Sequence, residues 1–148
     1  MKPFVSTPIG VAPADIGTSY SRADLIFDGV DHSGRSYALR VFFNNPAATG
    51  SAELSAENGY AGSLYVFGHG GCFGDEGHCE VPAEREPFDV RPPHQLTPAK
   101  LWLEVTDPIR QFAQGTDRLV ITVVPVATSE AAPDTPLPFE RISLVTYA

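Results

Sequence analysis

Proline and glycine interrupt this chain so often that no long helix and no long strand is expected. The 148 residues include 14 prolines and 13 glycines. Proline lacks the backbone N–H that helices and sheets use, and glycine loses the most conformational freedom when it is ordered. Hydrophobic residues nevertheless make up 43% of the chain, which is enough for a core. The chain therefore favours one domain of many short strands.

The segments between these breaks carry the two-residue periodicity of β-strands. In the clearest case, 35–43, large hydrophobic side chains occupy every second position (Tyr37, Leu39, Val41 and Phe43). Such alternation predicts a strand with one buried face. Five more strands are predicted over 23–30, 60–67, 100–106, 118–126 and 139–147. The nearly continuous hydrophobic run at 118–126 predicts burial on both faces.

The remaining segments predict an arm, a helix and a long loop. Residues 1–21 are rich in Pro, Gly, Ser and Ala, which predicts a linker or extended arm before a β-sandwich domain over 22–148. Asp107 followed by proline predicts the start of a short helix over 109–114. A Gly/Pro-rich loop over 68–98 is long enough to suggest a function. The predicted fold is an all-β antiparallel sandwich with one short helix.

The charge of the chain disfavours several classes of partner. The net charge is −8, and the ten basic residues are scattered. This negative charge repels nucleic acids and anionic membrane surfaces, so neither is expected as a partner. No hydrophobic run is long enough to span a bilayer, and the first ten residues lack the hydrophobic stretch of a signal peptide. We therefore expect a cytoplasmic protein, or a secreted one if a signal has been removed.

Four segments resemble, in their order, the C-terminal β-sandwich domain of type-3 copper proteins. They read YALRVFFNN at 37–45, YAGSLYVFGH at 60–69, LVITVVP at 119–125 and ISLVTY at 142–147. Plant polyphenol oxidases, bacterial tyrosinases and mollusc haemocyanins carry such domains, which are also similar to cupredoxins. This chain has Leu39, Arg40 and Val41 where the plant pattern has Phe-Asp-Val. The insert over 70–98 looks more like the bacterial versions.

The resemblance implies a companion role rather than an enzyme. In this family the sandwich packs over the entrance of a dicopper site that lies in a separate helical domain, and it shields that site until proteolysis removes it. The dicopper centre takes six histidines on a helical bundle. This chain has four histidines and no predicted long helix, so no oxidase activity and no resident cofactor are expected.

A glycine-rich stretch holds two histidines and both cysteines of the chain: His69, Cys72, His78 and Cys79. Imidazole and thiolate are natural ligands of Zn²⁺ and Cu(I), which makes a copper site one hypothesis. The spacing does not match a zinc finger, and the six residues between Cys72 and Cys79 also suit a disulfide. Two free, packed thiols are the third interpretation. A blue-copper site is disfavoured because the one methionine is Met1.

Isolated residues elsewhere carry weaker signals. His32 lies in a predicted turn and His94 follows two prolines, and we expect both to be exposed surface residues. Trp102 lies on an alternating strand, where a core position is the expected role. No Gly-x-Ser-x-Gly, Walker or His-Glu-x-x-His motif is present.

Three functions follow from these observations. The first is a companion of a tyrosinase-like oxidase, fused or separate, with His69 and Phe73 of the loop as predicted contacts. The second is a copper-handling protein that holds Cu(I) through the four loop residues and passes it to an apo-oxidase. The third is a self-associating structural module, because sandwiches with exposed strand edges often pair into homo-oligomers.

Overall fold

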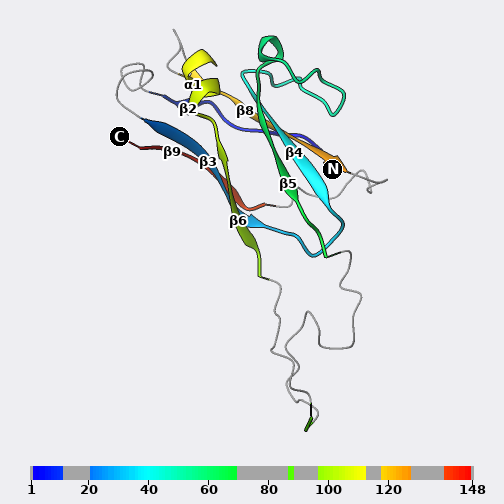
Figure 1. Cartoon of the computed structure of the whole chain (residues 1–148). Coiled ribbons are helices and arrows are strands. Elements are labelled where there is room, and N and C mark those ends of the chain that lie inside the picture. Colours follow the sequence, from blue (N-terminus) through cyan, green and yellow to red (C-terminus); the bar gives the residue numbers. More distant parts are fainter. Residues whose placement is uncertain are drawn as a thin grey trace.

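The computed structural model describes residues 2–11, 21–69, 87–88, 97–112, 118–127 and 139–147. Within these ranges the chain forms two packed antiparallel sheets, a pair of short strands and one α-helix (Figure 1). The prediction of an all-β sandwich with a short helix is confirmed.

Each of the two main sheets combines strands from distant parts of the chain. The first has the order β1-β8-β4-β5 and comprises Phe4–Val5, Ile121–Ala127, Tyr37–Phe43 and Tyr60–Val66. The second has the order β6-β3-β9 and comprises Ala99–Glu104, Arg22–Val30 and Arg141–Tyr147. Strand β2 (Ile9–Gly10) pairs with β7 (Arg118–Leu119), and a 3-10 turn, η2, covers Ala56–Asn58. Five of the six predicted strands thus form with ends shifted by at most two residues, whereas the predicted strand 118–126 is divided into β7 and β8, which belong to different sheets.

The amino-terminal arm contributes strands to the sandwich. Phe4 pairs with Val123 of β8, and Ile9 pairs with Leu119 of β7. The Ser6 hydroxyl also accepts a hydrogen bond from the Ile121 amide at 2.9 Å. Within residues 2–11, the described part of the arm, the backbone thus adds β1 to the edge of the first sheet and pairs β2 with β7.

The core lies between the two sheets and is built from the alternating positions. Leu25 and Phe27 of β3 face Leu39 and Val41 of β4, and all four are fully buried. Burial of each such side chain contributes about 1.5–3 kcal/mol relative to exposure. The period-two pattern in the sequence therefore identified the inward face of each main strand.

The loop between β4 and β5 folds back over the outer face of the first sheet. Phe42 points away from the main core but is fully buried, because it packs with Ala48 of this loop and Val124 of β8. The Arg40 guanidinium anchors the loop by donating to the carbonyl of Gly50 at 2.6 Å. The predicted burial of β8 on both faces is confirmed, since Ile121 to Val124 are all buried.

Gly62 explains the Ala-Gly-Ser sequence at the start of β5. Its φ of +139° lies in a region that side-chain-bearing residues rarely adopt. A Cβ at this position would lie 3.1 Å from both δ-carbons of Leu103 on β6. Glycine at this point therefore allows the two sheets to approach each other.

The helix α1 (Thr106–Phe112) begins earlier than predicted. The amide of Ile109 donates to the carbonyl of Val105 at 2.9 Å, so the first turn closes around Val105 and Asp107 lies inside the helix. The Thr106 hydroxyl accepts from the buried amide of Ala23 at 3.0 Å. This bond fixes the start of α1 against β3. The predicted end of the helix lies outside the described residues.

The prediction that Trp102 is a core residue is wrong. Its side chain is 61% exposed on the outer face of the second sheet. Its neighbours Leu101 and Leu103 fill the core, and strand alternation then directs Trp102 outward.

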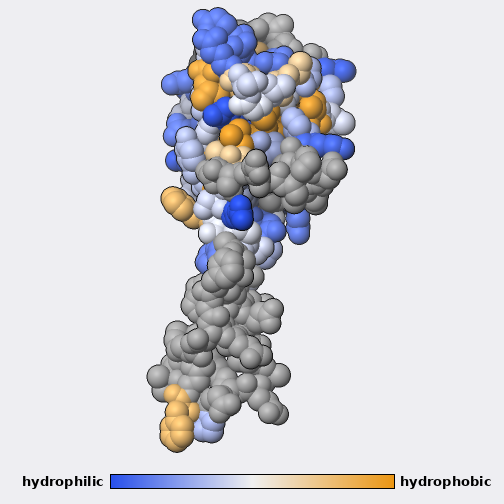
Figure 2. All heavy atoms as spheres, turned by 90° about the vertical axis from the view of Figure 1, so that its right-hand side faces the viewer, coloured by the Kyte–Doolittle hydropathy of each residue, from blue (hydrophilic) through white to orange (hydrophobic). Residues whose placement is uncertain are grey.

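The opposite side of the molecule presents a mixed surface. The view toward β4 and β8 shows hydrophobic residues in small separate groups among hydrophilic ones (Figure 2). No helix in the described part of the chain is long and hydrophobic enough to cross a membrane.

Candidate functional site

The long insert leaves the sandwich at the end of the β4–β5 hairpin, next to the turn between β3 and β4. Phe67 follows β5 and is 84% exposed. Gly68 then lies directly on the backbone of Gly34 and Arg35, closer than any side chain would permit. Its amide donates to the hydroxyl of Ser36 at 3.1 Å. These contacts hold the start of the insert against the β3–β4 turn.

This packing brings His69 against His32. The amide of His69 donates to the carbonyl of His32 at 2.9 Å, and the two ring centroids lie 5.1 Å apart with an interplanar angle of 63°. The Nε2 of His32 lies 2.8 Å from the carbonyl oxygen of Thr97. A carbonyl only accepts, so Nε2 carries the proton and Nδ1 of the neutral ring keeps its lone pair. A carbonyl behind the imidazole is also the usual arrangement of metal-binding histidines.

The turn that carries His32 is fixed by its own polar groups. The Asp31 carboxylate accepts from the hydroxyl of Ser33 at 2.7 Å and from its amide at 2.9 Å. These two donors hold the pKa of Asp31 below its usual value. The Tyr37 hydroxyl donates to the carbonyl of Asp31 at 2.7 Å. Burial, helped by the nearby Asp31 charge, raises the pKa of Tyr37 above its ordinary value.

His32 is therefore not the freely exposed turn residue that the sequence suggested. It is half-buried, and its ring contacts two distant parts of the chain, Thr97 and His69. The pairing with His69 was missed because the two residues are distant in sequence. One signal was present in the sequence. His32 precedes one predicted strand and His69 follows the next, and in an antiparallel hairpin these two positions lie at the same end.

The other predicted site residues lie outside the described part of the chain. These are Cys72, Phe73, His78 and Cys79, and His94 of the same loop. Among the described residues, no group of three or more His, Cys, Asp or Glu side chains is placed to hold a metal ion. The metal site, the disulfide and the free thiols therefore remain alternative predictions.

The chain was compared with known proteins at the levels of sequence and structure. No protein-family model matches it, and no curated protein matches it in sequence. Solved structures of latent aurone synthase, a polyphenol oxidase, do match. The enzyme from its natural source aligns with 98% of this chain at a TM-score of 0.55 and 14% identity. The recombinantly expressed enzyme aligns with 98% at a TM-score of 0.52 and 13% identity.

The match covers 24% of the polyphenol oxidase chain. At this identity the comparison shows a shared fold and nothing finer. The predicted resemblance to a polyphenol oxidase is confirmed at that level, whereas its assignment to the C-terminal domain of such enzymes remains a prediction. The sandwich described above has the fold of one part of a polyphenol oxidase.

Proposed function

We propose that this chain is a non-catalytic companion domain that packs on, shields or stabilises a tyrosinase-like dicopper oxidase, either fused to it or separate. One observation carries the proposal: almost the whole chain matches about a quarter of a latent polyphenol oxidase. The other three quarters of such an enzyme lie in segments that this chain does not match. The resemblance assigns the six copper-binding histidines to a helical domain, and this chain has four histidines in all.

The end of the sandwich that carries the insert is the proposed contact surface. Phe67 lies at the root of the insert and Phe88 lies within it, and they are 84% and 93% exposed. Exposed aromatic side chains of this size are favoured at the centres of protein interfaces. His69 stands beside Phe67, and Phe73 of the same loop is the residue predicted to approach the oxidase.

The test mixes the purified chain with a tyrosinase-like oxidase domain that lacks its own sandwich. Binding is measured by calorimetry, and diphenol oxidation is followed with and without the chain. We expect binding and a reduced oxidation rate. Phe73→Ala and Phe67→Ala are expected to weaken binding by about tenfold or more, as loss of an interface aromatic does.

Leu54→Ala provides the matched control. Leu54 is 46% exposed and lies in the loop between β4 and β5, at the other end of the hairpin from Phe67. This variant should bind like the unmodified chain. Absence of binding together with an unchanged oxidation rate would overturn the companion role.

Copper handling is a second candidate, because of the His32–His69 pair. The two rings already touch, and the hydrogen bond to Thr97 orients the His32 ring as in a ligating histidine. We propose that His69, Cys72, His78 and Cys79 bind Cu(I), with His32 beside them. Titration with Cu(I) should show loss of affinity in His69→Ala and Cys72→Ser, with His94→Ala as the histidine control. A metal-free protein whose cysteines form a disulfide, shown by mass spectrometry, would exclude this function.

Self-association into homo-oligomers remains a prediction, and light scattering tests it by measuring the molar mass of the protein in solution. A single monomeric species at high concentration would exclude this third function.

A further inference from the structure

The outer face of the second sheet bears a groove that the functions above do not use. Its volume is about 660 Å³, within the usual range for small-molecule sites. All three strands line it: Arg22, Asp24 and Ile26 from β3, Lys100 and Trp102 from β6, and Tyr147 from β9. The first sheet has a loop folded over part of its outer face, whereas Trp102 of this sheet remains 61% exposed. The groove therefore offers an uncovered aromatic surface.

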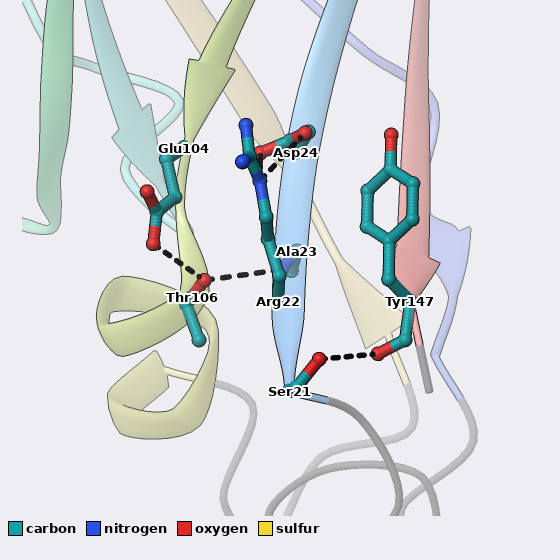
Figure 3. A network of polar contacts seen from close by, with 7 residues as sticks. All are labelled: Ser21, Arg22, Ala23, Asp24, Glu104, Thr106 and Tyr147. Carbon is teal, nitrogen blue, oxygen red and sulfur yellow. Dashed lines mark hydrogen bonds and ion pairs between the residues drawn. The ribbon is translucent and has the colours of Figure 1, made fainter.

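The charged groups in the groove are paired with one another. The Nε of Arg22 donates to both carboxylate oxygens of Asp24, at 2.9 and 3.0 Å, and the Arg22 guanidinium lies 5.9 Å from the centre of the Tyr147 ring (Figure 3). The Asp24 side chain is only 5% exposed. The planar guanidinium is thus held between a carboxylate and an aromatic ring.

A second set of pairs flanks Trp102 on the other side. The carboxylate of Asp28 contacts Arg141 at 2.7 Å and Lys100 at 3.1 Å. The hydrogen bonds from Arg141 and then from Lys100 hold the pKa of Asp28 below its usual value. With Glu104 added, the face carries three acidic and three basic side chains, so it has no net charge to attract an ion.

Trp102 and Tyr147 lie too far apart to contact the same small ring. Trp102 pairs with Ile26 of β3, and Tyr147 pairs with Arg22 of β3. These two β3 residues are four positions apart. At about 3.3 Å per residue, the two positions are separated by about 13 Å along β3. A ligand that uses both aromatic rings must therefore be extended.

The chemistry of this face selects a neutral, flat and hydroxylated ligand. Aromatic rings stack on the C–H face of a pyranose, while paired carboxylates and guanidinium groups hydrogen-bond to its equatorial hydroxyls. A protein partner fits less well, because Asp, Glu and Lys side chains, which this face carries beside its aromatic residues, are depleted at the centres of protein interfaces, and burial of these ion pairs would be costly. We propose that the groove over β6, β3 and β9 binds a neutral oligosaccharide, with Trp102 and Tyr147 contacting different sugar units.

The test uses the full chain and soluble hexasaccharides as probes: cellohexaose, xylohexaose, laminarihexaose, maltohexaose, mannohexaose and chitohexaose. Trp102 is the single tryptophan, so its fluorescence reports directly on the groove. We expect a saturable change with at least one probe, confirmed by calorimetry. The affinity should depend little on salt, because no net charge is neutralised.

Trp102→Ala should weaken binding by at least about tenfold, and Trp102→Phe should retain part of it. Both are measured by calorimetry, with thermal unfolding checked in parallel. Tyr65→Ala is the matched control: Tyr65 is 75% exposed on β5 of the other sheet, and its removal should change nothing. Failure of every probe, or equal affinity in Trp102→Ala, would overturn the site. Because the chain is tested alone, this result is independent of the oxidase assay.

Discussion

Replacing Gly62 with alanine is the sharpest test of how the two sheets meet. The substitution adds one methyl group at a position whose φ is +139° and whose nearest foreign atoms are the two δ-carbons of Leu103, each at 3.1 Å. Two separable costs are therefore expected. One is backbone strain on β5, and the other is steric overlap with β6.

The magnitude follows from these two terms. A non-glycine residue held in such a sparsely populated backbone region costs about 1–3 kcal/mol. An extra methyl group in a well-packed core costs about another 1–3 kcal/mol. Gly62→Ala should therefore lower the free energy of unfolding by about 2–6 kcal/mol, which is a large part of the stability of an ordinary domain.

Urea denaturation followed by circular dichroism measures this loss, and a double-mutant cycle separates the two terms. In a Leu103→Ala background the overlapping carbons are gone, so Gly62→Ala should cost only the backbone part, about 1–3 kcal/mol. Gly50→Ala is the control, because a Cβ there would meet only a methyl group of Val126 at an ordinary 3.9 Å.

Two results would refute this argument. A loss below about 0.5 kcal/mol in Gly62→Ala would mean that the chain tolerates a side chain at this φ. An equal loss in the presence and absence of the Leu103 side chain would mean that β5 and β6 do not approach each other at this point.

Three further substitutions test the polar contacts. Burial raises the pKa of Tyr37, so its neutral form contributes stability that is complete below its ordinary pKa and is lost as pH rises above it. Tyr37→Phe should flatten the alkaline limb of a stability–pH curve, and the exposed Tyr65→Phe serves as its control. The pKa of Asp28 is lowered by its two basic partners, so its contribution is present above the ordinary Asp value and disappears as pH falls through the lowered one. Asp28→Asn should flatten the acid limb, and an unchanged limb would contradict these ion pairs. Thr106→Val leaves the buried amide of Ala23 without an acceptor and should cost about 1–3 kcal/mol in urea denaturation. Thr106→Ser keeps the hydroxyl, and an equal loss in both variants would argue against this bond.

The strands of the sandwich could be predicted because each is specified by its own sequence. The alternation of Leu39 and Val41 with Ala38 and Arg40 requires one buried face, whatever the strand packs against. The same reasoning located β8, whose continuous hydrophobic run matches burial on both sides.

The features that escaped prediction depend on contacts between distant segments. Phe4 joins a sheet only because β8 leaves an edge open there. The His32 ring is oriented by its hydrogen bond to the carbonyl of Thr97, and no local sequence pattern predicts a bond between such distant residues. Trp102 was assigned to the core because it lies on an alternating strand, although Leu101 and Leu103 occupy the inward positions of that strand.

The pairing of β3 with β9 has a consequence for the order in which the domain can assemble. Arg22 pairs with Tyr147, so the central strand of the second sheet cannot complete its pairing until a segment far along the chain, β9, has been synthesised. Contacts this distant in sequence slow folding, and β3 has an unpaired edge until they form. A nascent chain is therefore expected to depend on chaperones until β9 has been synthesised. Proteolytic removal of β9 would reopen that edge.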